Sequence, residues 1–113
     1  MIAATIDRVL AWDLAGADLP PADVALGLLS QLTHHGQTVA TDLSTLCLSL
    51  PPDSQAGHTA KATLGEASRR LSLSAPAGTP QAAAHRTQNT ARLLRALLRA
   101  VEAVAEEAQI PRR

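Results

Sequence analysis

Residues 82–108 read AAAHRTQNTARLLRALLRAVEAVAEEA, and this stretch decides the fold. Its apolar and small residues recur in alternating steps of four and three, which places them on one face of a helix; they are Ala83, Thr87, Thr90, Leu94, Leu97, Val101, Val104 and Ala108. The opposite face is polar, and Pro111 ends the pattern. A helix with so wide an apolar face has to bury it. The stretch therefore predicts a long helix over 81–109 that the rest of the chain covers.

The composition points to an all-α domain. The chain has 113 residues, enough for one domain with a core of its own, so residues 1–113 are expected to form a single helical unit. Hydrophobic residues make up 46% of the chain but aromatic residues only 1%, so the core has to be built mostly of Leu and Ala. Both are strong helix formers.

Three further helices are expected, over 2–15, 21–50 and 55–72, separated by Pro and Gly. The second has an apolar stripe of Val24, Leu28, Leu32, His35, Val39, Leu43, Leu46 and Leu50. Gly36 interrupts it, which predicts a kink or the close approach of another helix. Ser54 or Asp53 is expected to cap the third helix, and Thr79 the last. Four helices, two of them long, predict an antiparallel four-helix bundle.

Charge and cysteine content restrict the partners and the compartment. Ten basic and ten acidic residues cancel, which argues against nucleic acid as a partner. No run reaches the roughly 18 apolar residues of a membrane span, so no membrane association is expected. The single Cys47 excludes an intramolecular disulfide and suits a reducing cytoplasm. The sequence thus indicates a cytoplasmic protein.

Three residues stand out as candidates for ligand or partner binding. His35 lies on the apolar stripe and His34 beside it, so His35 is expected to be at least partly buried, where it either packs or lines a pocket. Adjacent residues diverge by about 100°, so the pair does not make a metal site. Trp12 lies at the edge of the first stripe, where it either seals the core or stacks on a ligand.

Arg92, Arg95 and Arg99 form a basic stripe on the last helix and are the remaining candidates. Such a stripe is usually a solvated face, and the alternative is a surface for a partner of complementary charge. Cys47 has no base within reach on its helix and is expected to act as a small hydrophobe. We find no motif that specifies a catalytic residue, a metal or a cofactor, so the sequence leaves open whether the protein is an enzyme.

Several short segments together resemble a family of small, uncharacterised actinobacterial proteins associated with natural-product biosynthesis. They are Leu32-Thr33-His34-His35, Glu66-Ala67-Ser68-Arg69-Arg70-Leu71, Ala77-Gly78 and Ala91-Arg92-Leu93-Leu94-Arg95-Ala96-Leu97-Leu98. The resemblance implies a link to a secondary-metabolite pathway. It implies no reaction and no catalytic residue.

The sequence thus favours a small helical binding or accessory protein that acts through protein–protein contacts or a helix groove. The alternative is a small enzyme or ligand-binding protein with a pocket between helices around His35. Leucines outside the main stripes, among them Leu26, Leu29 and Leu93, predict exposed apolar surface on the two long helices. Such surface is commonly buried against a second copy, so we expect a homodimer with the second or last helix at its interface.

Overall fold

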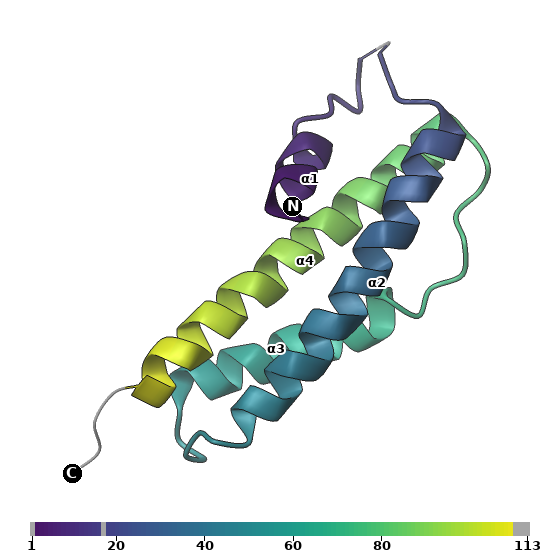
Figure 1. Cartoon of the computed structure of the whole chain (residues 1–113). Coiled ribbons are helices and arrows are strands. Elements are labelled where there is room, and N and C mark those ends of the chain that lie inside the picture. The colour runs from purple at the N-terminus through teal and green to yellow at the C-terminus, as the bar shows by residue number, and fades with distance from the viewer. Residues whose placement is uncertain (1, 17, 110–113) are drawn as a thin grey trace.

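A computed structural model of the chain describes residues 2–16 and 18–109 and has four helices there (Figure 1). They are α1 (Ile2–Leu10), α2 (Ala22–Cys47), α3 (Gln55–Arg70) and α4 (Pro80–Gln109). Successive helices run antiparallel, so the predicted four-helix bundle with two long helices is confirmed. The long helices α2 and α4 consequently run parallel to each other and form the spine of an elongated molecule of 57 × 24 × 21 Å.

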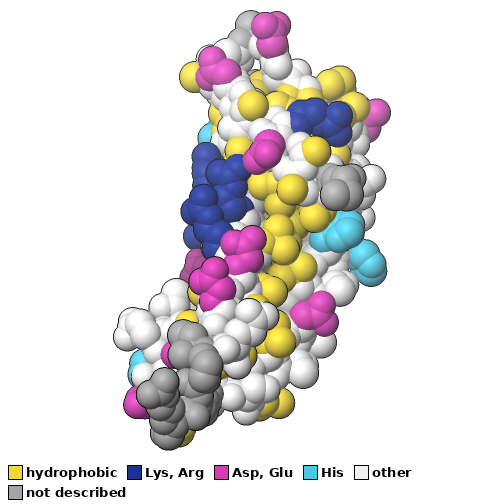
Figure 2. Space-filling model, turned by 60° about the vertical axis from the view of Figure 1, so that its left-hand side comes forward, with side chains coloured by type: hydrophobic (Ala, Val, Ile, Leu, Met, Phe, Trp, Pro, Cys, Tyr) yellow, Lys and Arg dark blue, Asp and Glu magenta, His cyan; other side chains and the backbone are white. Residues whose placement is uncertain are grey.

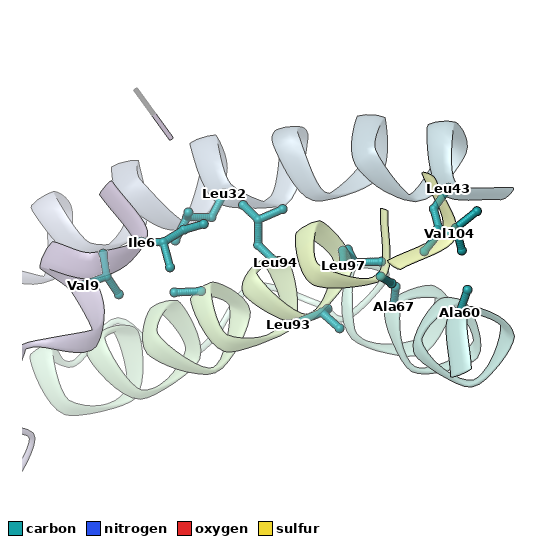
Figure 3. Packing of buried hydrophobic residues seen from close by; sticks show 12 residues of the cluster. Ile6, Val9, Leu32, Leu43, Ala60, Ala67, Leu93, Leu94, Leu97 and Val104 are labelled. Atoms are coloured by element: carbon teal, nitrogen blue, oxygen red, sulfur yellow. The ribbon is translucent and has the colours of Figure 1, made fainter. Parts of the chain in front are cut away.

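The core forms around α4, which packs against all three other helices. Its widest apolar part is covered rather than open: Leu93, Leu94 and Leu97 are all buried (Figure 3). They meet Leu32 and Leu43 from α2, together with alanines from α3 and apolar residues from α1. The surplus apolar surface that the sequence predicts on the last helix is therefore absent, because three neighbours share its wide stripe.

The first helix ends at Leu10, five residues before the predicted end, and a distant side chain accounts for this. Gln88 on α4 is 4% exposed, and its amide nitrogen lies 3.2, 3.4 and 3.1 Å from the carbonyl oxygens of Val9, Leu10 and Trp12. The last carbonyls of a helix have no partner within the helix. The Gln88 amide is such a partner, so α1 can end here with its last carbonyl groups hydrogen-bonded. Trp12 lies just past this end, half-buried against the core.

The buried face of α2 differs from the predicted stripe at two positions, Val24 and His35, where the following residue is buried instead: Val24 is exposed and Ala25 is buried. Gly36 is buried and His35 is exposed, so the expected burial of His35 is wrong. A Cβ built on Gly36 would lie 3.1 Å from Cδ2 of Leu71, the residue that follows α3. Of the two explanations that the sequence left open for Gly36, a kink or the close approach of another helix, the structure supports the close approach. With Gly36 facing inward, helical geometry turns its neighbour His35 toward the edge of the face.

The caps at two helix starts are as the sequence predicts. Ser54 accepts a 2.9 Å hydrogen bond from the backbone nitrogen of Gly57, and Thr79 accepts one of 3.2 Å from Ala82. Ser54 is buried, and its hydroxyl also donates to the carboxylate of Glu107. Ser54 therefore caps the N-terminus of α3 and also links α3 to the C-terminal end of α4.

Candidate functional site

The histidine pair lies on the surface of α2. His34 and His35 are both exposed, and their ring centroids are 6.2 Å apart in an edge-to-face arrangement. The largest hollow is lined by neither residue. The alternative of an inter-helix pocket around His35 required a buried His35, and the structure does not support this. Within the part of the chain that the structure describes, no three His, Cys, Asp or Glu side chains gather as metal ligands.

The largest hollow is an open groove of about 460 Å³ between α2 and α3. Its lining is uncharged and consists mostly of small residues and hydroxyls: Gln37, Ala40, Thr41, Ser44, Thr45, Leu64, Ala67, Ser68, Leu71 and Ser72. We call it the α2–α3 groove. Leu71 reaches Gly36 at one end, but beyond this point small side chains on both helices leave the space between them unfilled.

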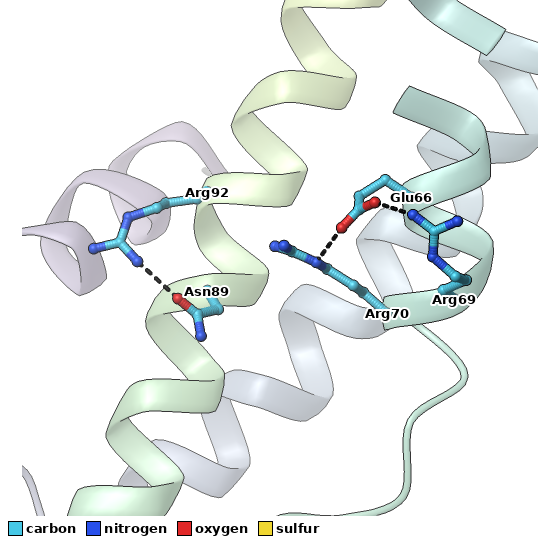
Figure 4. Close-up of polar contacts among 5 residues, drawn as sticks. All are labelled: Glu66, Arg69, Arg70, Asn89 and Arg92. Atoms are coloured by element: carbon cyan, nitrogen blue, oxygen red, sulfur yellow. Dashed lines mark hydrogen bonds and ion pairs between the residues drawn. The ribbon is translucent and has the colours of Figure 1, made fainter. Parts of the chain in front are cut away.

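The groove continues past Leu64 and Ser44 into a second hollow at the end of α2. Leu48 lines this second hollow and is 86% exposed, the most exposed large hydrophobic residue among those described. The charged residues of α3 do not line the first hollow. Glu66 instead forms ion pairs with Arg69 and Arg70 of its own helix (Figure 4).

The three candidate arginines do lie together, in a separate place. Arg92, Arg95 and Arg99 line a hollow of about 380 Å³ with Leu10 and Ala96, at the junction of α1 and α4. We call it the basic hollow. Figure 2 shows basic side chains gathered as a dark blue patch on this flank of the molecule. Trp12 contributes to the junction through its carbonyl, which accepts from Gln88.

These arginines are only partly a solvated face, because two of them make defined contacts. The guanidinium of Arg92 donates to Asn89 at 2.8 Å, as Figure 4 shows, and to Gln88 at 3.0 Å. Arg95 forms a 2.7 Å ion pair with Asp7 on α1. Arg99 is exposed and has no hydrogen bond or ion pair with a described residue.

Sequence reasoning missed the groove residues. Gln37, Thr41, Ser44 and Leu48 recur in steps of 4, 3 and 4, but a search for apolar stripes passes over a row whose first three members are polar. The signal that could have found them is Leu48, a large apolar residue in line with small ones. Cys47, expected as a small hydrophobe, is half-buried and packs against the core.

The fold and these two sites place the chain in the class of small helical bundles with an uncharged groove and a basic hollow. Sequence comparison assigns it to a family. The model of a family of unknown function (DUF6415) matches residues 1–106, and the chain belongs to this family. No curated protein and no solved structure matches the chain. Among the described helices, none is both long and apolar enough to cross a bilayer.

Proposed function

We propose that this protein is a small helical binding or accessory protein that acts through protein–protein contact, with a second copy of itself as the partner. The observation that carries the proposal is the α2–α3 groove with the exposed Leu48 beside it. An exposed apolar side chain next to an uncharged hollow on the same face is self-complementary. That is the requirement for an isologous, twofold interface.

The register of the residues fits such a pairing. Gln37, Thr41, Ser44 and Leu48 share the outward face of α2, where each is exposed. If two α2 helices cross antiparallel about a point between Ser44 and Thr45, Leu48 of one copy lies opposite Thr41 of the other. Thr41 lines the groove. The small residues at the crossing point allow the two backbones to approach closely.

Charge and area set the expected strength. The lining of the α2–α3 groove contains no charged residue, and Lys61 lies only in the second hollow beside Leu48, away from the crossing point, so like charges do not meet at the centre of the interface. From Gln37 to Leu48 the helix rises about 17 Å, and two adjacent helices span roughly 20 Å across. This footprint is about 340 Å² per copy, so two copies would bury on the order of 700 Å², which lies in the range of weak, transient contacts and below that of stable interfaces. We therefore expect a weak dimer, with a dissociation constant in the micromolar range.

Light scattering coupled to size-exclusion chromatography tests the proposal across a range of protein concentrations. The wild-type mass should rise from 11.8 kDa toward twice that value as the concentration increases. Leu48→Ser and Ser44→Arg should each weaken the dimer by about tenfold or more, because the first removes the protruding apolar group and the second places like charges opposite each other.

Val24→Ser is the matched control, since Val24 is a 48% exposed apolar residue at the other end of α2 and does not line the groove. It should leave the dissociation constant unchanged. A mass that stays at 11.8 kDa up to millimolar concentration would reject self-association. An equal loss in Val24→Ser would place the interface elsewhere.

A link to natural-product biosynthesis and a cytoplasmic location complete the proposal. The first is supported by the sequence resemblance alone, and the second by the single cysteine and the absence of a membrane-spanning helix among the described residues. An affinity pull-down from the native host, with Ser44→Arg as the reference bait, tests the pathway. Recovery of the same proteins by wild type and variant would contradict a role of the groove.

A further inference from the structure

We infer that the basic hollow at the α1–α4 junction binds a phosphate monoester, that is, a phosphate group carried on a small, partly apolar molecule. This site is separate from the α2–α3 groove and shares no lining residue with it. The inference therefore goes beyond the proposed function and stands or fails independently of it.

The first step is geometric. Arg92, Arg95 and Arg99 follow each other in steps of three and four, so their side chains leave α4 in similar directions. From the first to the last, the helix rises about 10 Å. The hollow that they line holds about 380 Å³, the lower range of small-molecule sites. Three planar guanidinium groups around one hollow offer the paired donors that match phosphate oxygens.

The second step is the charge balance. Arg92 is oriented by the amide oxygens of Gln88 and Asn89, which are neutral and leave its charge uncompensated. Arg95 is balanced by Asp7, whereas Arg99 has no partner among the described residues. The three cations outnumber Asp7 and Glu102, the two carboxylates of the adjoining hollow, by one, and the excess is larger at Arg92, which does not line that hollow. A phosphate monoester carries about −1.5 to −2 near pH 7 and has three acceptor oxygens for several guanidinium groups, whereas a single carboxylate has one charge and two oxygens.

Acidic groups bound the site on one side only. Glu102 lies with Asp7, Arg95 and Arg99 around a neighbouring hollow and makes no ion pair with either arginine. It does not line the basic hollow itself. The positive field is therefore strongest toward Arg92, where Leu10 and Ala96 provide an apolar wall.

The apolar wall and the size of the site favour a small ligand over nucleic acid. Nucleic-acid binding draws on an extended basic surface, yet this chain has no net charge and no Tyr or Phe on which bases could stack. Its one Trp, Trp12, is half-buried against the core. Leu10 and Ala96 instead suit a short aliphatic or aryl group attached to the phosphate.

Isothermal titration calorimetry at low ionic strength tests the inference with four probes: phenyl phosphate, inorganic phosphate, benzoate and a short single-stranded oligonucleotide. We expect saturable binding of phenyl phosphate, weaker binding of inorganic phosphate and no binding of benzoate. Tighter binding of phenyl phosphate than inorganic phosphate indicates an ester site. Equal binding of the two indicates a site for free phosphate and overturns the role of the apolar wall.

Arg99→Gln is the informative variant, because Arg99 is exposed and makes no hydrogen bond or ion pair with a described residue. It should weaken phenyl phosphate binding about ten- to a hundredfold, the effect of losing one charge-assisted contact. Arg8→Gln is the matched control: it removes the same charge from an exposed residue of α1 that does not line the hollow. Its affinity should stay within about twofold of wild type on the scale of screened surface charges.

Several outcomes would overturn the inference. Equal losses in Arg99→Gln and Arg8→Gln would mean attraction to the overall charge rather than a site. Benzoate binding as tight as phenyl phosphate would mean that the phosphate is not recognised. Preference for the oligonucleotide would replace the small ligand with nucleic acid, and absence of saturation by any probe would mean that no site exists.

Discussion

The amide of Gln88 holds the C-terminal end of α1 against α4 through hydrogen bonds. The change in the free energy of unfolding when this amide is removed can be calculated from the structure. In Gln88→Met the side chain keeps nearly its length but loses both donors. An amide nitrogen has two hydrogens, so at most two of its three close carbonyls, those of Val9, Leu10 and Trp12, are fully bonded at one time. The variant therefore loses about two hydrogen bonds to these carbonyls, together with the part-buried one that Arg92 donates to the Gln88 amide oxygen.

The expected cost follows from these bonds and from burial. Two hydrogen bonds contribute about 1 kcal/mol each to the free energy of unfolding, and a buried acceptor left without a partner costs about 1–3 kcal/mol. The Val9 carbonyl keeps the 3.2 Å hydrogen bond from the backbone nitrogen of Trp12, and Leu10 and Trp12 are half-buried, so water can reach some of the freed carbonyls. We expect Gln88→Met to lower the free energy of unfolding by about 2–4 kcal/mol.

Urea unfolding followed by two signals measures both the size and the place of this loss. Circular dichroism reports all four helices, whereas fluorescence reports Trp12, the only Trp in the chain. In the variant the fluorescence transition should occur at lower urea than the loss of helix, because α1 detaches first. Gln81→Met on an exposed position of α4 is the control and should change stability by less than about 0.5 kcal/mol. A Gln88→Met variant as stable as this control would refute the capping role of Gln88.

Two further predictions concern the helices themselves, and thermal unfolding checks both. Gly27→Ala in α2 and Gly65→Ala in α3 should each stabilise the protein by about 0.5–1 kcal/mol, since an added Cβ meets no atom within 4 Å. Gly36→Ala should stabilise it less than either, because its Cβ would crowd Leu71. A gain at Gly36 equal to the others would contradict the close approach. Ser54→Ala should cost about 1–2 kcal/mol through the lost cap of α3, and Glu107→Gln, which still accepts from the Ser54 hydroxyl, should cost less. The reverse order would mean that the carboxylate rather than the cap holds α3.

The sequence was sufficient where the controlling interaction is local. The period of the apolar residues predicted four helices, and the Ser54 and Thr79 caps were readable because a cap acts within three residues. It was insufficient where the interaction is long-range. The end of α1 depends on Gln88, 78 positions beyond Leu10 in the sequence. The inward face of α2 depends on Leu71, which a pattern within α2 alone does not contain.

The candidate sites divide in the same way. The arginine stripe was visible in the sequence because helical spacing groups its members, but its balance of charge depends on Asp7 and Gln88, which only the fold brings near. The α2–α3 groove was not visible at all. A hollow forms where two facing helices both lack large side chains. In a sequence, small polar residues such as Ser44 and Ser68 look the same whether they face solvent or line a groove.

Both sites follow from the same feature of the architecture. The parallel pair of α2 and α4 is long, whereas α1 and α3 are shorter, lie toward opposite ends of the pair and make no contact with each other in the described part (Figure 1). A fully closed bundle would bury all the inward-facing side chains in one common core. Here each short helix instead leaves an open hollow beside a long one. The α2–α3 groove lies beside α3, where the facing residues are small, and the basic hollow lies beside α1, where arginines of α4 border Leu10. Surfaces left over by packing are free to be used for binding, and their different chemistry, uncharged in one and cationic in the other, makes two separate partners the natural expectation.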